Sequence, residues 1–168
     1  MEGYAQGKLN AVRNKNGIWI NTQVFREEAN HFSKYGYYCA DPQGSPGYYE
    51  YWDEQTKRCK EGYTVGGVSI TGDHYAYLNF YPILKVDMKA TSSDNVATKI
   101  QDMPDFWDGD YNYYWAKHIA FKGCSNKFIK DLKLEIKIEP EFLDGGNHMI
   151  VGKSRRKGYS FKNAALLV

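Results

Sequence analysis

Residues 147–168, which read NHMIVGKSRRKGYSFKNAALLV, limit the possible folds of this chain more than any other segment. Residues 148–151 form a short apolar run after an Asp-Gly-Gly turn, as a buried strand would. Ser160 is a suitable helix cap, and the alanines and leucines at 164–167 favour a helix after it. Between them lies the basic, glycine-containing segment 153–160. This order predicts a phosphate-binding loop, and a solvated basic turn is the simpler alternative.

The segment differs from the common phosphate-binding pattern in the position of its lysine. That pattern is G-x-x-x-x-G-K-[ST]. Here Lys153 stands in place of the first glycine and Tyr159 in place of the usual lysine, while Gly158 and Ser160 match. Backbone N–H groups and the N-terminus of the following helix hold phosphates wherever the lysine is attached. A long lysine side chain reaches the phosphates from either flank, and the hydroxyl of Ser160 can serve Mg²⁺.

The string Lys-Ser-x-Arg-x-Gly-Tyr-Ser resembles the displaced-lysine Walker A motif of the large terminase subunits of tailed bacteriophages. Two further segments look like the region that precedes the motor in this family, EGYTVGGVSITGDHYAYLNF at 61–80 and FWDGDYNYYW at 106–115. The resemblance implies an ATPase that uses ATP and Mg²⁺ to package DNA, normally followed by a nuclease domain. The partners that it implies are double-stranded DNA, the small terminase subunit and the portal protein.

The resemblance also implies roles for individual residues. Trp107 or Tyr111 is expected to stack on the adenine ring. At least one of Arg155 and Arg156 is expected to act on the γ-phosphate as a finger or sensor, although arginines there can instead contact DNA phosphates. The residues expected to bind the nucleotide are those of the loop: Lys153, Ser154, Lys157, Gly158, Tyr159 and Ser160.

The expected fold class is an α+β amino-terminal region leading into the first βα unit of an α/β P-loop ATPase of the ASCE type. Residues 1–90 are expected to form an aromatic-rich region, residues 91–104 a polar linker and residues 105–168 the start of the ATPase domain. Caps and apolar spacing predict helices at 22–35, 46–60, 71–80 and 109–121. Strands are expected at 17–20, 63–65, 68–70 and 83–86, whereas 127–138 fits either helix or strand.

Catalysis by a P-loop enzyme needs an acidic residue after a later strand. The sequence stops before any such strand, so we expect a fragment of a longer protein that is inactive alone. The alternative function is a non-catalytic phage module that binds DNA or a protein through a basic tail. This alternative is favoured by five cations after Val151 with no Asp or Glu: Lys153, Arg155, Arg156, Lys157 and Lys162.

Other polar clusters have structural explanations that are simpler than catalysis. Asp105, Asp108 and Asp110 precede a predicted helix, where capping explains them more simply than a metal site. Asp73 and His74 fit the first turn of a helix. The three cysteines form no C-x-x-C pair and complete no zinc pattern. No signal peptide or membrane-length apolar run occurs, so the family resemblance implies the host cytoplasm during infection.

Overall fold

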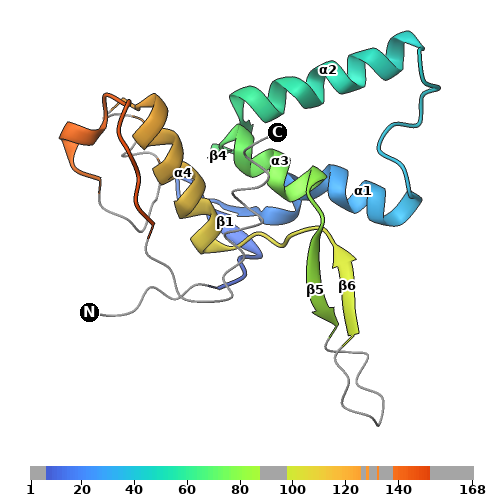
Figure 1. Ribbon diagram of the computed structural model, residues 1–168, viewed down its shortest axis with the longest axis horizontal. Helices are drawn as coiled ribbons and strands as arrows, with labels where there is room; N and C mark the ends of the chain where they lie inside the picture. Colours follow the sequence, from blue (N-terminus) through green and yellow to red (C-terminus); the bar gives the residue numbers. More distant parts are fainter. Residues whose placement is uncertain (1–6, 88–97, 126–127, 129–131, 133–137, 152–168) are drawn as a thin grey trace.

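The computed structural model describes residues 7–87, 98–125, 128, 132 and 138–151 (Figure 1). Within them, four α-helices carry most of the regular structure: α1 (Glu27–Tyr35), α2 (Pro46–Glu61), α3 (Gly72–Phe80) and α4 (Asp108–Lys122). Two short 3-10 helices are η1 (Thr22–Arg26) and η2 (Pro140–Phe142). The strands are β1 (Ala11–Arg13), β2 (Trp19–Asn21), β3 (Tyr63–Val65), β4 (Val68–Ile70), β5 (Ile83–Asp87) and β6 (Thr98–Asp102).

The described strands pair only with a sequence neighbour, which gives three separate two-stranded antiparallel sheets: β1–β2, β3–β4 and β5–β6. This part of the chain is therefore a small α+β arrangement. A P-loop ATPase fold would add a parallel sheet, and that part of the expected fold class stays a prediction.

Local capping explains the bounds of α2. The hydroxyl of Ser45 accepts a hydrogen bond from the backbone N–H of Tyr48, and Pro46 occupies the first turn. At the other end, Gly62 has a positive φ of 98° and donates its N–H to the carbonyl of Arg58. The prediction of a helix from 46 to about 60, closed by Gly62, is confirmed.

The predicted helix at 22–35 begins as the 3-10 helix η1 and continues as α1. Thr22 was the expected cap, but its hydroxyl donates to the backbone oxygen of Leu9 over 2.6 Å. The side chain of Asn21 caps the helix instead, accepting from the N–H of Gln23 over 2.9 Å. The predicted end at Gly36 is confirmed, since this residue has a φ of 79°.

The segment at 63–80 forms as predicted. Gly66 and Gly67 make the turn between β3 and β4, both with positive φ. The hydroxyl of Thr71 then accepts a hydrogen bond from the N–H of His74 and caps α3.

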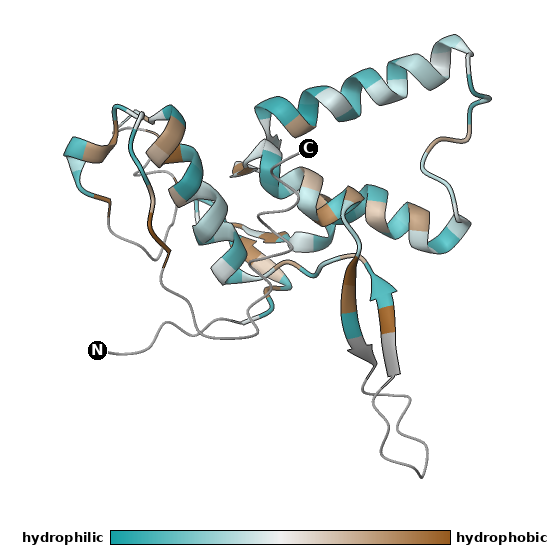
Figure 2. Ribbon diagram, viewed as in Figure 1, coloured by the Kyte–Doolittle hydropathy of each residue, from teal (hydrophilic) through white to brown (hydrophobic). Residues whose placement is uncertain are grey.

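The main core lies where η1, β4, α3 and α4 meet. Phe25, Ile70 and Leu78 are at most 1% exposed, and Phe106 and Trp115 bring α4 and the segment before it onto the same cluster. A second cluster consists of Tyr77, Tyr113 and Tyr114. Because tyrosine has weakly hydrophilic hydropathy, much of α3 and α4 is pale in Figure 2 although these helices carry the core.

The hairpin of β5 and β6 projects away from the four helices (Figure 1). Residues 98–102 belong to the expected linker at 91–104, yet they form strand β6. Furthermore, residues on both sides of that linker share one core, as the contact of Phe25 with Phe106 shows (ring centroids 5.7 Å apart). The domain boundaries themselves stay predictions.

The predicted strand at 148–151 is wrong. These residues have no regular secondary structure, and Ile150 is 98% exposed. Gly146 and Asn147, which precede this run, bind to the end of α4 instead. Their N–H groups donate to the carbonyls of Phe121 and Ala120. An apolar run of four residues becomes a strand only beside a partner strand, and within the described residues none pairs with it.

Candidate functional site

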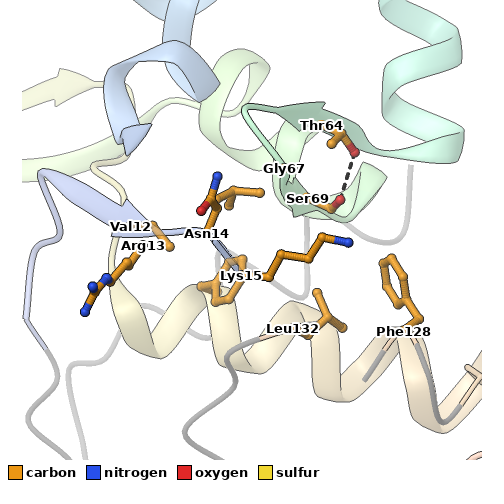
Figure 3. Close-up of a pocket in the computed structure, with 11 residues that line it drawn as sticks. Val12, Arg13, Asn14, Lys15, Thr64, Gly67, Ser69, Phe128 and Leu132 are labelled. Carbon is orange, nitrogen blue, oxygen red and sulfur yellow. Dashed lines mark hydrogen bonds between the residues drawn. The ribbon is translucent and has the colours of Figure 1, made fainter. Parts of the chain in front are cut away.

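A pocket of about 190 Å³ lies between the β1–β2 and β3–β4 hairpins (Figure 3). Tyr111 of α4, Phe128 and Leu132 contribute aromatic and apolar side chains to it. The hairpins supply the remaining lining residues: Val12, Arg13, Asn14, Lys15, Thr64, Gly67, Val68 and Ser69.

The side chain of Asn14 fixes the two hairpins to each other. Its Nδ2 donates to the backbone oxygen of Gly66 over 2.6 Å, and its Oδ1 accepts from the N–H groups of Asn16 and Ile18, both at 2.9 Å. Asn14 is only 5% exposed, so these bonds are worth more than similar bonds at the surface. These bonds hold the two hairpin walls of the pocket together.

Tyr111 is the predicted site residue that reaches this pocket. It is 6% exposed and packs against Phe106, with ring centroids 5.9 Å apart. Burial raises the pKa of Tyr111 to about 12. Nearby, Trp115 donates from its indole Nε1 to the backbone oxygen of Ser69 over 3.2 Å, which holds α4 against β4.

Trp107, the other predicted adenine contact, does not line the pocket. It is 41% exposed and precedes α4, where its backbone oxygen accepts from the N–H groups of Asp110 and Tyr111. The remaining predicted site residues lie outside the described residues: Lys153, Ser154, Arg155, Arg156, Lys157, Gly158, Tyr159 and Ser160.

The chemistry of the pocket is that of binding. Its lining includes aromatic rings, aliphatic groups, the hydrogen-bonded hydroxyls of Thr64 and Ser69, 2.8 Å apart, and two cationic residues. No Cys, His, Asp or Glu is among the described lining residues. The guanidinium of Arg13 donates to the backbone oxygen of Gly17 in its own hairpin and points away from the pocket (Figure 3), so the surface suits a flat, partly polar ligand.

The three aspartates near α4 do not converge on one point. Asp108 is 7% exposed, and its Oδ1 accepts from the N–H groups of Gly7 at 2.8 Å and Gly109 at 2.6 Å. Asp108 and Asp110 both lie in the first turn of α4, where negative charge is favoured. Across the described part of the chain, no three His, Cys, Asp or Glu side chains group as metal ligands would.

Asp105 instead forms the centre of an ionic network that the sequence did not reveal. Its carboxylate pairs with Lys8 at 3.0 Å, with Arg26 at 3.4 Å and with Lys85 at 3.4 Å. Burial would raise the pKa of Asp105, but the hydrogen bond from Lys8 and the charges of Lys85 and Arg26 hold that pKa below its ordinary value. Arg26 is 79 positions away in the sequence, so spacing gave no signal of this contact.

The expected structural role of Asp73 and His74 is confirmed. Both lie in the first turn of α3, and Asp73 pairs with Lys117 over 3.0 Å. The ring of His74 is completely buried and stacks on Tyr114, with centroids 4.9 Å apart.

Comparisons of this chain with protein-family models, with curated proteins and with solved structures found no match. Within the described residues, none of the helices combines the length and the apolar character that crossing a bilayer requires.

Proposed function

We propose that this chain is the amino-terminal part of a large terminase subunit of a tailed bacteriophage. Its reaction would be ATP hydrolysis coupled to DNA packaging in the host cytoplasm, with ATP and Mg²⁺ as cofactors. Double-stranded DNA, the small terminase subunit and the portal protein would be its partners. The observation that carries the proposal is the string Lys-Ser-Arg-Arg-Lys-Gly-Tyr-Ser at 153–160.

Two features on which the resemblance rests lie in the described part of the chain. Residues 61–80, which share the resemblance, form the β3–β4 hairpin and α3 at the centre of the described core. Tyr111, one of the two expected adenine contacts, lines a pocket beside this hairpin.

The test is binding of MgATP to the full chain, measured by calorimetry on the wild type and on alanine variants. Lys153→Ala should weaken binding about ten- to a hundredfold, because a charge-assisted contact to phosphate is worth about 1.5–3 kcal/mol. Tyr159→Ala should have a smaller effect. Lys57→Ala is the matched control, since Lys57 is an exposed lysine of α2.

If Lys157→Ala removes binding and Lys153→Ala does not, the wrong lysine has been assigned. The second candidate function is a DNA- or protein-binding module, which the five cations of the tail favour. In that case MgATP does not bind, and replacing any one of the tail cations weakens DNA binding by a similar factor.

A further inference from the structure

A second, more polar cavity lies on a different part of the molecule. It has a volume of about 240 Å³ and is formed by the end of α2, the start of α3 and the second half of α4. Its described lining residues are Cys59, Lys60, Gly72, Asp73, His118 and Lys122.

The walls of this cavity are fixed by backbone packing. α2 and α3 meet so closely that a Cβ atom at Gly72 would lie 2.1 Å from the backbone oxygen of Cys59. α4 is held to the same unit by the ion pair of Lys117 with Asp73 at 3.0 Å. Lys60 of α2 and Lys122 of α4 therefore line one cavity.

The cavity carries a net positive charge. Lys60 and Lys122 line it together with His118, and Lys117 stands one residue away on α4. Asp73 is the acidic residue of the lining, and it already pairs with Lys117. Burial lowers the pKa of His118, and the charges of Lys122 and Lys117 lower it further against the opposing charge of Asp73.

A simpler reading accounts for each lysine separately. Lys60 and Lys122 both lie in the last turn of a helix, where the macrodipole favours a cation. That reading does not explain why the two ends converge on one cavity with a histidine. The start of α3 forms part of the same wall, and its own Asp73 supplies negative charge to the first turn.

The charges of the lining favour an anion over a cation as the ligand. Burial raises the pKa of the Cys59 thiol to about 11, which disfavours its thiolate form. Cys59, Asp73 and His118 also do not group as metal ligands would within the described residues. An anion with several oxygen acceptors complements two lysines and an imidazole.

We propose that this cavity is a phosphate-binding site, in which Lys60 and Lys122 contact phosphate oxygens and His118 donates a hydrogen bond. The phosphate comes either from a free anion or from the backbone of DNA. None of the described lining residues belongs to the segment 153–160, and the inference does not rest on the proposed ATPase function.

The first test measures the pKa of the His118 ring by NMR in the full chain, in phosphate and in chloride at equal ionic strength. Bound phosphate favours the charged imidazolium, so the pKa of His118 should shift upward in phosphate. In the double variant Lys60→Gln with Lys122→Gln, this shift should be lost. Lys57→Gln on the exposed face of α2 should retain it.

The second test separates the two sources of phosphate by measuring binding to a short DNA duplex over a range of salt concentrations. If DNA occupies the site, the double variant should reduce the slope of log K against log salt by about 0.9 for each lost phosphate contact, whereas Lys57→Gln should not. If the double variant leaves the slope unchanged but loses the phosphate-dependent His118 shift seen in the wild type, the site takes free phosphate and not DNA. If the double variant keeps that shift, the assignment of Lys60 and Lys122 is wrong. The proposal is overturned if phosphate does not shift the His118 pKa and the double variant behaves like Lys57→Gln.

Discussion

The side-chain amide of Asn79 donates a hydrogen bond to the backbone oxygen of Phe25 over 2.9 Å, across 54 positions of the sequence. The same side chain donates to the backbone oxygen of Tyr75 at 3.0 Å and accepts from the N–H of Ala29 at 3.1 Å. One buried amide thereby joins η1, α1 and α3.

Replacement of Asn79 by alanine should destabilise the fold strongly. Asn79 is 0% exposed, so Asn79→Ala leaves buried backbone groups without their partner and opens a small cavity. We expect the free energy of unfolding to fall by about 2–4 kcal/mol, measured by urea denaturation. Asn30→Ala on the exposed side of α1 is the control, with an expected change within about 0.5 kcal/mol. Equal effects of the two variants would contradict this role for Asn79.

Gly72→Ala should be destabilising although alanine is the better helix former. The new Cβ would meet the backbone oxygen of Cys59 at 2.1 Å, and backbone cannot move aside cheaply. A loss of about 1–3 kcal/mol in thermal or urea unfolding is expected. Gly47→Ala in α2 is the matched control, because its Cβ would meet the side-chain Oδ2 of Asp41, which can rotate away. A neutral Gly72→Ala would show that α2 and α3 are less tightly joined than described.

The network around Asp105 should make stability depend on pH. Because its folded-state pKa lies below the ordinary value of 3.8, Asp105 stabilises the fold fully above that value and loses this contribution as pH falls through the lowered pKa. Urea unfolding at about pH 7 and at about pH 2.5 should show a smaller pH-dependent loss for Asp105→Asn than for the wild type. Asp53→Asn on the exposed face of α2 should keep the wild-type dependence. A wild-type dependence in both variants would rule out this assignment.

The two residues expected to contact adenine should behave differently when truncated. Tyr111→Ala should lower the free energy of unfolding by about 3–5 kcal/mol, since the ring is buried in the main core. Trp107→Ala should cost about 1 kcal/mol, because the indole is half exposed. Thermal unfolding of both variants measures this difference. A more destabilising Trp107→Ala would contradict the placement of the two rings.

Sequence reading succeeded where the signal is local. The cap at Ser45, the turn at Gly66 and Gly67 and the cap at Thr71 each act within a few residues, so the helices and hairpin around them were predicted correctly. The cap of the first helix was predicted wrongly, because the hydroxyl of Thr22 donates to the backbone oxygen of Leu9 and Asn21 caps η1 instead.

Features that depend on contacts between residues distant in sequence could not be predicted from local patterns. Strand β6 has the polar sequence TKIQD, and only its pairing with β5 makes it a strand. Residues 148–151 show the opposite case, an apolar run without a described partner. The ion pairs of Asp105 and the cavity beside His118 join residues that are far apart in sequence, so neither produced a motif.

The projecting β5–β6 hairpin should open more easily than the helical core of the described part of the chain. A two-stranded hairpin is marginal by itself, and Leu84 and Ile100 remain 60% and 39% exposed. Among its described side chains, Lys85 forms ion pairs with Asp102 at 2.8 Å and with Asp105. Amide hydrogens of the hairpin should thus exchange with solvent through local opening, whereas those of α3 should exchange only through global unfolding. A force or a partner acting on the hairpin could separate its strands while the aromatic core stays intact.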